Sequence, residues 1–352
     1  MSRFLRAPFD AMAPYVPGEQ PRDKAYVKLN TNESPFPPSP GVLRAVAEEA
    51  PSLKLYSDPE CTSLRQTAAT LFGISPDNIF CGNGSDEVLN FAFLAFCGKD
   101  KGIAFPSVSY GFYPVFADLY SLDYDAIPLK ADFTIDVDDY CSLDKNIVIA
   151  NPNAPTGLSL SVADIRKILD SNRDNLVIID EAYVDFGGES CLPLIGEYDN
   201  LLVVQTFSKS RSLAGARLGF GFAQKEIIAD LNKIKYSTNP YNINRETLAA
   251  GEAALKEQSY YDENCRKIIE NRNYTTAALE SLGFTVLPSK ANFIFASTPR
   301  MSGEALYLAL KDKGILVRHF SRKDIADYVR ITIGSMEQMH ALIAAVQEIL
   351  RQ

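Results

Sequence analysis

Five short apolar runs, each bounded by turn residues, constrain the fold of this 352-residue chain more than any other feature. The runs are rich in β-branched residues, show no polar alternation, and span 79–81, 103–105, 147–150, 176–179 and 201–204. Such runs are typical of strands that are buried on both faces of a mainly parallel sheet. Buried helices are the alternative, but the runs are short for helices. The sequence therefore predicts an α/β fold, with a large domain whose mostly parallel sheet is flanked by helices.

The pattern changes after about residue 240. A long polar helical stretch stops at Gly283, and short apolar segments and two further helices follow, as expected for a smaller α+β domain. At the other end, the first 40 residues are rich in proline, which removes backbone donors, so we expect an extended arm there. The predicted units are an N-terminal arm and small-domain segment over 1–30, a large domain over 31–240, and a small C-terminal domain over 241–352.

Charge and composition argue against several kinds of function. The net charge of −9 disfavours nucleic acid and anionic membranes as partners. No apolar run is long enough to span a bilayer, and the first ten residues lack the apolar core of a signal peptide, so we expect a cytoplasmic protein. Six scattered cysteines and two histidines, His319 and His340, predict free thiols and no metal site. Proton transfer must then use another group, such as a lysine.

Lys209 follows directly after a predicted strand. Ser208 and Ser210 flank it, and Arg217 comes eight positions later. An amine that bonds an aldehyde needs a lowered pKa, while hydroxyls and a guanidinium can bind a phosphate. The segment therefore predicts a lysine that is attached to a phosphorylated aldehyde cofactor. A solvated basic loop is the alternative that these residues alone leave open.

Two glycines precede an apolar helix in the segment 82–87, where Ser85 could cap the helix. Glycines let backbone N–H groups approach an anion, and the N-terminus of a helix attracts phosphate. This signal is weak by itself, because capped helices after glycine are common. It is not the glycine fingerprint of a dinucleotide site.

Asp180 and Tyr183 stand at the end of the most apolar predicted strand. A carboxylate there is partly desolvated and needs a cationic partner. A protonated pyridine nitrogen would meet this need, and the ion pair would make the ring a better electron sink. Tyr183 could then hydrogen-bond a ring hydroxyl. An aspartate that only caps the strand–loop junction is the alternative.

Further candidates follow other predicted strands. Asn153, in the turn 151–157, could offer an amide to such a cofactor, although the turn alone would be unremarkable. Tyr110 could lay its ring on a planar cofactor, or it could simply pack in the core. Arg318 and Arg330 end or lie within apolar segments of the small domain. If Arg330 points inward, its guanidinium needs an anion, which suggests a substrate; surface positions are the alternative for both arginines.

In their order along nearly the whole chain, these motifs resemble those of the fold-type I pyridoxal-phosphate aminotransferases, and among them the histidinol-phosphate aminotransferase family. The other segments that carry the resemblance are Pro14-Tyr15-Val16-Pro17-Gly18, Lys28-Leu29-Asn30-Thr31-Asn32-Glu33-Ser34-Pro35, Tyr56-Ser57-Asp58-Pro59, Lys290-Ala291-Asn292-Phe293, Gly314-Ile315-Leu316-Val317-Arg318 and Val329-Arg330-Ile331-Thr332-Ile333-Gly334. A set this long and ordered is far more specific than any one member.

The resemblance implies that pyridoxal 5'-phosphate is the cofactor, held by the large domain, and that the reaction is transamination of L-histidinol phosphate with 2-oxoglutarate in histidine biosynthesis. By position in the motifs, Lys209 would hold the cofactor as a Schiff base and shuttle the proton, and Asp180 would pair with the pyridine nitrogen. Tyr183 and Asn153 would hold the ring oxygen, and Tyr110 would stack on the ring.

The same resemblance implies a phosphate site and a substrate site. The cofactor phosphate would meet Ser85, Asp86 through its backbone, Ser208 and Arg217, and also Tyr56 from the second subunit of a homodimer. The substrate would meet Tyr15, Asn32, Arg318 and Arg330.

One residue departs from the family pattern. Relatives often carry asparagine directly before the Pro-Thr-Gly turn, where this chain has Ala154. The neighbouring Asn153 could substitute for it. Two other activities of the same fold, aromatic amino-acid transamination and threonine-phosphate decarboxylation, stay open, as does a non-catalytic protein that binds a phosphate-bearing ligand.

Overall fold

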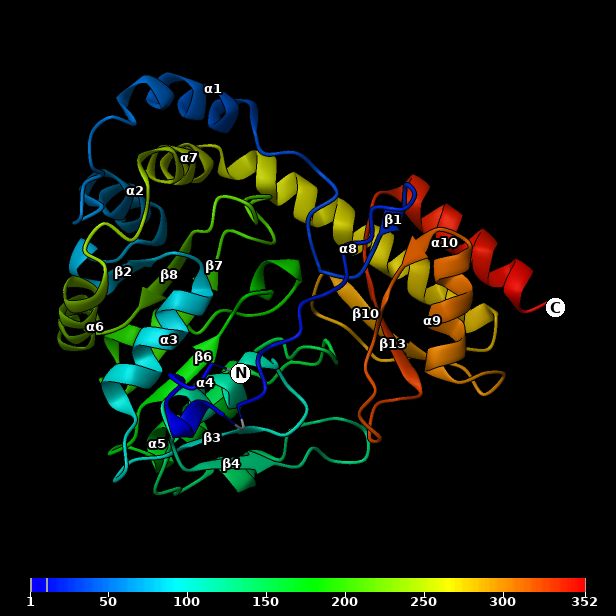
Figure 1. The fold of residues 1–352 in the computed structure, drawn as a ribbon, viewed down its shortest axis with the longest axis horizontal. Helices are drawn as coiled ribbons and strands as arrows, with labels where there is room; N and C mark the ends of the chain where they lie inside the picture. Colours follow the sequence, from blue (N-terminus) through cyan, green and yellow to red (C-terminus); the bar gives the residue numbers. More distant parts are fainter. Residues whose placement is uncertain (1, 11, 352) are drawn as a thin grey trace.

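The computed structural model describes residues 2–10 and 12–351 of the chain. Within these residues, the largest sheet has seven strands in the order β2-β8-β7-β6-β5-β3-β4 (Figure 1). They are β2 (Ile79–Gly82), β3 (Ile103–Pro106), β4 (Tyr124–Ile127), β5 (Asn146–Ala150), β6 (Val177–Asp180), β7 (Leu201–Thr206) and β8 (Gly219–Phe222). β8 is antiparallel to both of its neighbours, and the other adjacent strands are parallel. The predicted α/β fold with a mostly parallel sheet is confirmed.

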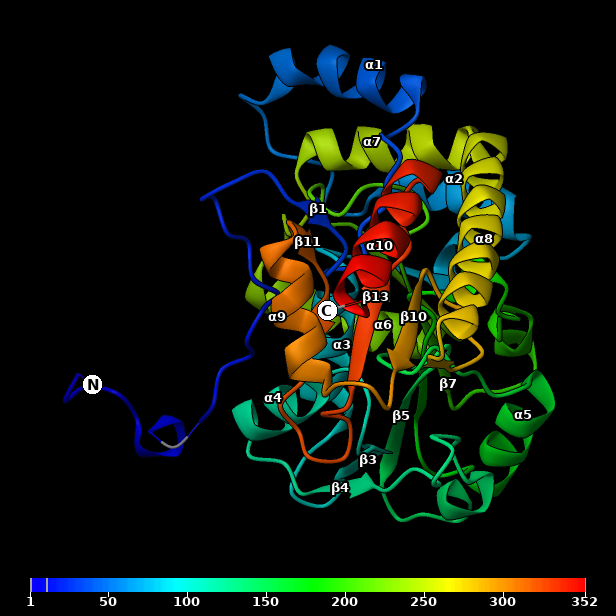
Figure 2. The same ribbon diagram turned by 90° about the vertical axis from the view of Figure 1, so that its right-hand side faces the viewer.

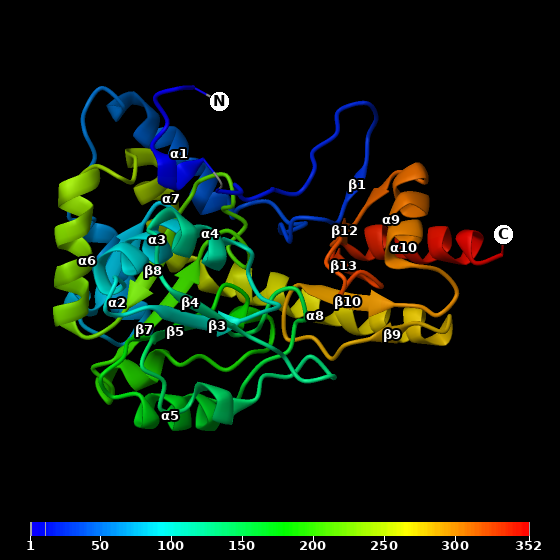
Figure 3. The same cartoon turned by 60° about the horizontal axis from the view of Figure 1, so that its bottom comes forward.

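The central strands are buried on both faces, which explains why their sequences show no polar alternation. In β5, Ile147 and Ile149 face one hydrophobic cluster, whereas Val148 and Ala150 face another. The first cluster includes residues of α2 (Thr62–Phe72), α5 (Val162–Ser171) and α7 (Arg245–Lys256); the second includes residues of α3 (Ser85–Phe96), α4 (Phe112–Leu119) and α6 (Lys225–Thr238). Figure 3 shows α5 on the opposite side of the sheet from α3 and α4. Outside these layers, α1 (Pro40–Glu49) packs on α7.

A second, antiparallel sheet has the order β12-β13-β10-β9. Its strands are β12 (Arg318–His319), β13 (Tyr328–Thr332), β10 (Phe293–Ser297) and β9 (Thr285–Val286), and it packs with α9 (Gly303–Asp312) and α10 (Met336–Ile349). The long helix α8 (Gln258–Ser281) joins the two parts of the molecule (Figure 1). Its Tyr261 lies in the core under the large sheet, whereas its Leu279 lies in the core of the small one.

The N-terminal segment is extended, as its prolines predict. Figure 2 shows its first residues projecting away from the body of the molecule. Short 3₁₀ turns lie there and elsewhere: η1 (Ala7–Phe9), η2 (Ala50–Ser52), η3 (Pro76–Asn78), η4 (Val137–Tyr140), η5 (Val184–Phe186) and η6 (Leu192–Gly196). The segment is not wholly irregular, because β1 (Val27–Lys28) pairs in parallel with β11 (Ile315–Leu316) of the C-terminal part. The predicted domain limits, 1–30, 31–240 and 241–352, stay a prediction.

Two strands of the large sheet, β8 and β4, were not predicted from the sequence. β8 reads Gly-Phe-Gly-Phe, and glycine disfavours strands; here it is required because a Cβ at Gly219 would overlap the backbone nitrogen of Ser85. β4 is an edge strand whose middle residues, Asp125 and Ala126, are exposed. No helix in the described part of the chain is both long and apolar enough to cross a membrane.

Candidate active site

Residues that follow five strands of the large sheet meet around one cavity. The carboxyl ends of parallel strands lie at one edge of a sheet, so loops after them converge. The inner cavity, of about 170 Å³, is lined by Thr31, Glu33, Ser85, Asp86, Tyr110, Ala150, Ala154, Asp180, Ala182, Tyr183, Thr206, Ser208, Lys209, Ala214 and Arg217. An outer cavity of about 770 Å³ shares several of these residues and extends to the N-terminal segment and the small sheet.

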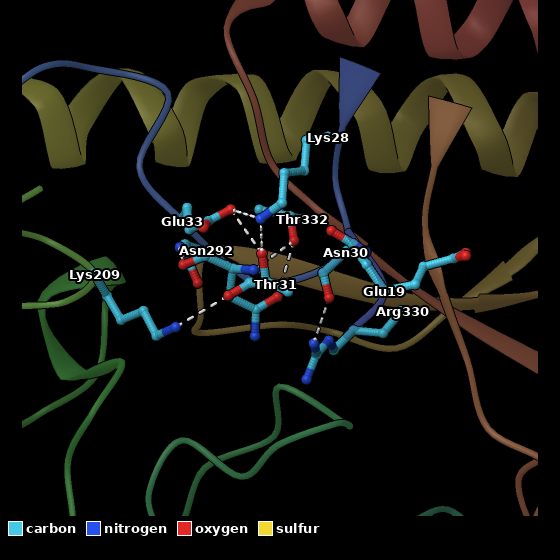
Figure 4. Close-up of polar contacts among 10 residues, drawn as sticks. Glu19, Lys28, Asn30, Thr31, Glu33, Lys209, Asn292, Arg330 and Thr332 are labelled. Atoms are coloured by element: carbon cyan, nitrogen blue, oxygen red, sulfur yellow. Dashed lines mark hydrogen bonds and ion pairs between the residues drawn. The ribbon is translucent and has the colours of Figure 1, made fainter. Parts of the chain in front are cut away.

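Lys209 stands between the two cavities and lines both. Its side chain is half-buried, and desolvation, together with the nearby Arg330 guanidinium, lowers the pKa of its amine to about 8. The Nζ atom donates a hydrogen bond to the backbone carbonyl of Thr31 at 3.1 Å (Figure 4). At neutral pH about a tenth of an amine with this pKa is deprotonated and nucleophilic, a far larger share than for an ordinary lysine.

Asp180 is the last residue of β6 and is 4 % exposed. Burial raises the pKa of its carboxyl to about 6. Its two oxygens accept hydrogen bonds from the Tyr113 hydroxyl at 2.9 Å and from the backbone nitrogen of Ala182 at 3.2 Å. Within residues 2–10 and 12–351 no lysine or arginine forms an ion pair with it. A cation bound in the cavity would therefore be stabilised here.

Tyr183 lines both cavities beside Lys209, whose Nζ lies 5.9 Å from the centre of its ring. Burial raises the pKa of the phenol, so its oxygen stays protonated at neutral pH. The hydroxyl oxygen accepts a hydrogen bond from Asn32 Nδ2 at 3.0 Å. Asn32 comes from the N-terminal segment, 151 residues earlier in the chain.

The predicted phosphate residues come together at the N-terminus of α3. Arg217 Nη2 lies 3.1 Å from an Asp86 carboxylate oxygen, and Arg217 Nη1 lies 3.4 Å from Ser208 Oγ. Tyr110 donates a hydrogen bond from its hydroxyl to the other Asp86 oxygen at 2.8 Å. A cation, a hydroxyl and the N-terminus of a helix thus face one end of the inner cavity, which is a suitable environment for a phosphate.

Ser85 does not cap α3, contrary to the sequence-based expectation. The capping position belongs to Gly84, and Ser85 is the first helical residue. Gly84 has φ of +79°, and a Cβ on it would come within 2.5 Å of Arg217 Nη2. The glycine therefore lets the helix end approach the arginine closely and leaves the first backbone N–H groups uncapped by a side chain.

The outer cavity brings together the predicted substrate residues Tyr15, Asn32, Arg318 and Arg330. Arg330 is half-buried and donates from Nη2 to the backbone carbonyl of Asn30 at 2.9 Å (Figure 4), while its buried Nε has no hydrogen-bond partner. Arg318 donates to the backbone carbonyls of Val16 and Pro17 in the N-terminal segment. A partly desolvated guanidinium that lacks a carboxylate partner creates a site for an anion.

Two predicted residues are not brought to the inner cavity. The Asn153 amide donates to Val108 O and Thr156 Oγ1, and its oxygen accepts from Ser109 Oγ, so its polar atoms connect the turn to the loop after β3. Ala154 lines the cavity in its place. Tyr56 is 79 % exposed and stacks on Tyr241 with ring centres 4.5 Å apart, away from both cavities of its own chain.

Three residues of the site were not predicted from the sequence. Tyr113 was hidden among the aromatic residues of α4, and its ring lies 5.6 Å from that of Tyr110, which precedes the helix. Thr206 lines the inner cavity, but the sequence pattern around Lys209 suggested no role for it. Arg322 lines the outer cavity from the loop between β12 and β13, where nothing in the sequence separates it from a surface arginine.

The inner cavity fits a phosphorylated pyridine that carries an aldehyde. Asp180 offers a buried carboxylate to a ring nitrogen, Lys209 offers an amine of lowered pKa, and Arg217 beside the helix end at Gly84 offers positive charge to a phosphate. The α/β fold with these groups at the carboxyl edge of its sheet defines the pyridoxal-phosphate enzymes of fold type I.

Comparison with known proteins narrows the class. The model of the aminotransferase class I and II family matches residues 24–346, and the chain belongs to this family. It is 50 % identical to the histidinol-phosphate aminotransferase of Brachyspira hyodysenteriae over the full length of both chains.

Solved structures agree with this assignment. The histidinol-phosphate aminotransferase of Sinorhizobium meliloti, in complex with pyridoxal-5'-phosphate, has a TM-score of 0.84 and 25 % identity, covering 93 % of this chain and 92 % of that one. An L-threonine-O-3-phosphate decarboxylase from Porphyromonas gingivalis has a TM-score of 0.81 at 21 % identity, covering 93 % of this chain and all of that one, which shows a shared fold alone.

Proposed function

We propose that this enzyme transfers the amino group of L-histidinol phosphate to 2-oxoglutarate, giving 3-(imidazol-4-yl)-2-oxopropyl phosphate and glutamate, with pyridoxal 5'-phosphate as its cofactor. The observation that carries the proposal is the 50 % identity over the full length to a histidinol-phosphate aminotransferase. The lowered pKa of Lys209 opposite the buried carboxyl of Asp180 supports it.

When bound, pyridoxal 5'-phosphate supplies an aldehyde and a ring that accepts electrons from the substrate α-carbon. Lys209 Nζ would bond the aldehyde at rest, give way to the substrate amine, and then take the proton from the substrate α-carbon as a general base. Asp180 would hold a proton on the ring nitrogen. Tyr183 would donate its hydroxyl proton to the ring oxygen, and Arg217 with the α3 N-terminus would hold the phosphate.

The two substrates would be recognised by the same arginines. Both carry an anionic group close to the reacting carbon: histidinol phosphate has its phosphate on the neighbouring CH2 group, and 2-oxoglutarate has a carboxylate next to the ketone. Arg330, whose Nε is unpartnered, and Arg318 line the outer cavity where such a group would lie. The net charge of −9 would otherwise repel anions, so these local cations would determine substrate binding.

An amino-donor assay tests the proposed reaction. The cofactor-loaded protein is given histidinol phosphate, phenylalanine or threonine phosphate with 2-oxoglutarate, and glutamate and CO2 are measured. We expect kcat/KM for histidinol phosphate to exceed that for phenylalanine by about a hundredfold, because only the phosphate ester engages the arginines as a dianion. Lys209→Ala serves as the inactive control. CO2 release from threonine phosphate would instead identify a decarboxylase, and equal rates with phenylalanine an aromatic aminotransferase.

We also propose that the enzyme is a homodimer in which Tyr56 reaches the cofactor phosphate of the partner subunit. Large apolar side chains are exposed around Tyr56, including Leu55 at 58 % and Leu53 at 53 %. Exposed apolar residues gathered in one segment are typical of an interface. A cytoplasmic location, expected from the sequence, stays a prediction.

A further inference from the structure

Asn32 is held by hydrogen bonds at each of its polar atoms. Its backbone nitrogen donates to Thr332 Oγ1 at 2.9 Å, and the same threonine hydroxyl donates to Asn32 Oδ1 at 2.9 Å. Its backbone oxygen accepts from Asn292 Nδ2 at 2.9 Å. The residue is 1 % exposed and has φ of +57°, a conformation that asparagine tolerates better than most residues. Figure 4 shows Asn292 and Thr332 gathered around this segment, between Lys209 and Arg330.

These contacts fix which way the Asn32 amide faces. Because Thr332 supplies a proton to Oδ1, the amide group Nδ2 points toward Tyr183 and donates to its hydroxyl oxygen. The Tyr183 oxygen accepts this bond, so its own proton is free for a different acceptor. The groups that act electrostatically on this phenol are the Arg330 guanidinium, the Asp180 carboxyl and the Tyr15 hydroxyl, while the Lys209 amine lies above its ring. Because Tyr183 lines the inner cavity, this proton can be donated to an acceptor bound there.

No amide comes to the cavity wall from the turn at 151–157. The wall there is the methyl group of Ala154, and the Asn153 side chain is hydrogen-bonded to Val108 and Ser109 of the loop after β3. The expected second donor to the cofactor ring oxygen is thus missing on this side. The Tyr183 hydroxyl would then donate to the ring oxygen without help from an amide of this turn. The direction of the hydroxyl proton would therefore decide whether the hydrogen bond forms.

We propose that Asn32 is a positioning residue that makes Tyr183 a hydrogen-bond donor to the ring oxygen of the cofactor, in place of the amide that Ala154 lacks. This role differs from the substrate contact that the sequence suggests for Asn32, and it rests on the proposed function. The ordered residues Thr332 and Asn292, from β13 and the loop before β10, hold Asn32 in place and so connect the small sheet to the cofactor.

The test replaces Asn32 by an isosteric acceptor. In Asn32→Asp the carboxylate would accept the Tyr183 proton and turn it away from the cavity, and aspartate also tolerates a positive φ. A donor to the ring oxygen stabilises the form of the cofactor in which the imine nitrogen has lost its proton. Its loss should therefore raise the pH midpoint of the visible absorption change of the cofactor-loaded protein by about one unit.

A double-mutant cycle separates positioning from a direct effect. Tyr183→Phe should raise the midpoint as much as Asn32→Asp does, and the double variant should show no further increase. Asn32→Gly, which keeps the backbone conformation and adds no charge, should shift the midpoint in the same direction by less. If circular dichroism shows that Asn32→Asp is unfolded, the midpoint of Asn32→Gly tests whether Asn32 positions Tyr183.

Two results would overturn the proposal. One is an unchanged midpoint in the Asn32 variants with a raised KM for the substrate, which would make Asn32 a substrate ligand. The other is a midpoint shift that persists in full in the Tyr183→Phe background. A wild-type protein that develops no visible band with pyridoxal phosphate would instead overturn the proposed function itself.

Discussion

At the scale of single residues, the candidate site depends on burial of groups that are usually charged. Burial lowers the pKa of the Lys209 amine and raises that of the Asp180 carboxyl, because in both cases it disfavours the charged form. In the proposed site the two shifts would serve opposite ends of one ligand: the lysine would act as a nucleophile, and the carboxylate would gain most from a cationic ring nitrogen. Neither group would be useful in this way on the surface.

The shifted pKa of Lys209 predicts the pH dependence of cofactor capture. Below its pKa the lysine is an ammonium ion that cannot attack the aldehyde, so the capture rate of the apoprotein should rise about tenfold per pH unit and level off above pH 8. Stopped-flow absorbance after mixing with pyridoxal phosphate measures this rate.

The variant Arg330→Gln tests whether the Arg330 charge contributes to the lowered pKa of Lys209. Since the Arg330 charge lowers the pKa of Lys209, its removal should move the midpoint of the rate profile upward. Arg318→Gln is the matched control, because Arg318 is engaged by the carbonyls of Val16 and Pro17. A wild-type midpoint near 10.5, the ordinary value for lysine, would contradict the interpretation.

At the scale of elements, helix α3 and the turn before it form the proposed phosphate site. The turn needs two glycines for different reasons: Gly84 adopts a positive φ beside Arg217, and Gly82 lies against Val88 of the helix. The sequence suggested an anion site here from its glycines. It assigned the cap to the wrong residue, because serine is the commoner capping side chain and the close approach of Arg217, 133 positions later, is invisible locally.

Gly84→Ala should therefore weaken cofactor binding selectively. The added methyl group would both strain the backbone and displace the Arg217 guanidinium, so we expect the dissociation constant for pyridoxal phosphate to rise about tenfold or more. Gly73→Ala is the matched control, since Gly73 also has a positive φ, of +68°, but nothing lies within 4 Å of its added Cβ. It should lower the melting temperature without changing cofactor affinity. Equal losses of affinity in both variants would indicate a general loss of stability.

At the scale of the whole molecule, the N-terminal segment and the loop around Tyr56 expose aromatic side chains that nothing in the described part of the chain covers. Figure 2 shows the first residues standing away from the body, and Phe4 there is 79 % exposed. Tyr56 lies apart from the cavities of its own chain. A second copy of the chain would cover such surfaces and complete the phosphate site.

Mixing two defective variants tests the shared site. Lys209→Ala should be inactive, and Tyr56→Ala should have about a tenth of normal activity or less, because it loses a hydrogen bond to a phosphate. After unfolding and refolding together, a mixed dimer would hold one site with both an intact Lys209 and an intact Tyr56. The mixture should then recover roughly a quarter of wild-type activity. Activity no higher than the average of the separate variants would mean that Tyr56 does not act across the interface.

The sequence alone determined the elements and the chemistry of the site to a large extent. Strands buried on both faces have a continuous apolar pattern, and turn or polar residues mark their ends, so β2, β3, β5, β6 and β7 were all predicted. The order of motifs identified Lys209, Asp180, Tyr183 and Arg217 as candidates, and these four meet at one cavity. Such features are local in the chain, or are fixed in order along it.

Only the tertiary structure decided which side chains contact each other over long separations. Tyr113 reaches Asp180 across 67 positions, and Thr332 reaches Asn32 across 300. The sequence could not show that the Asn153 amide donates to Val108, 45 positions earlier, because a hydrogen bond depends on distance and direction in space. Local patterns record how a segment folds, whereas the partners of a buried polar group are chosen by the packing of the whole chain.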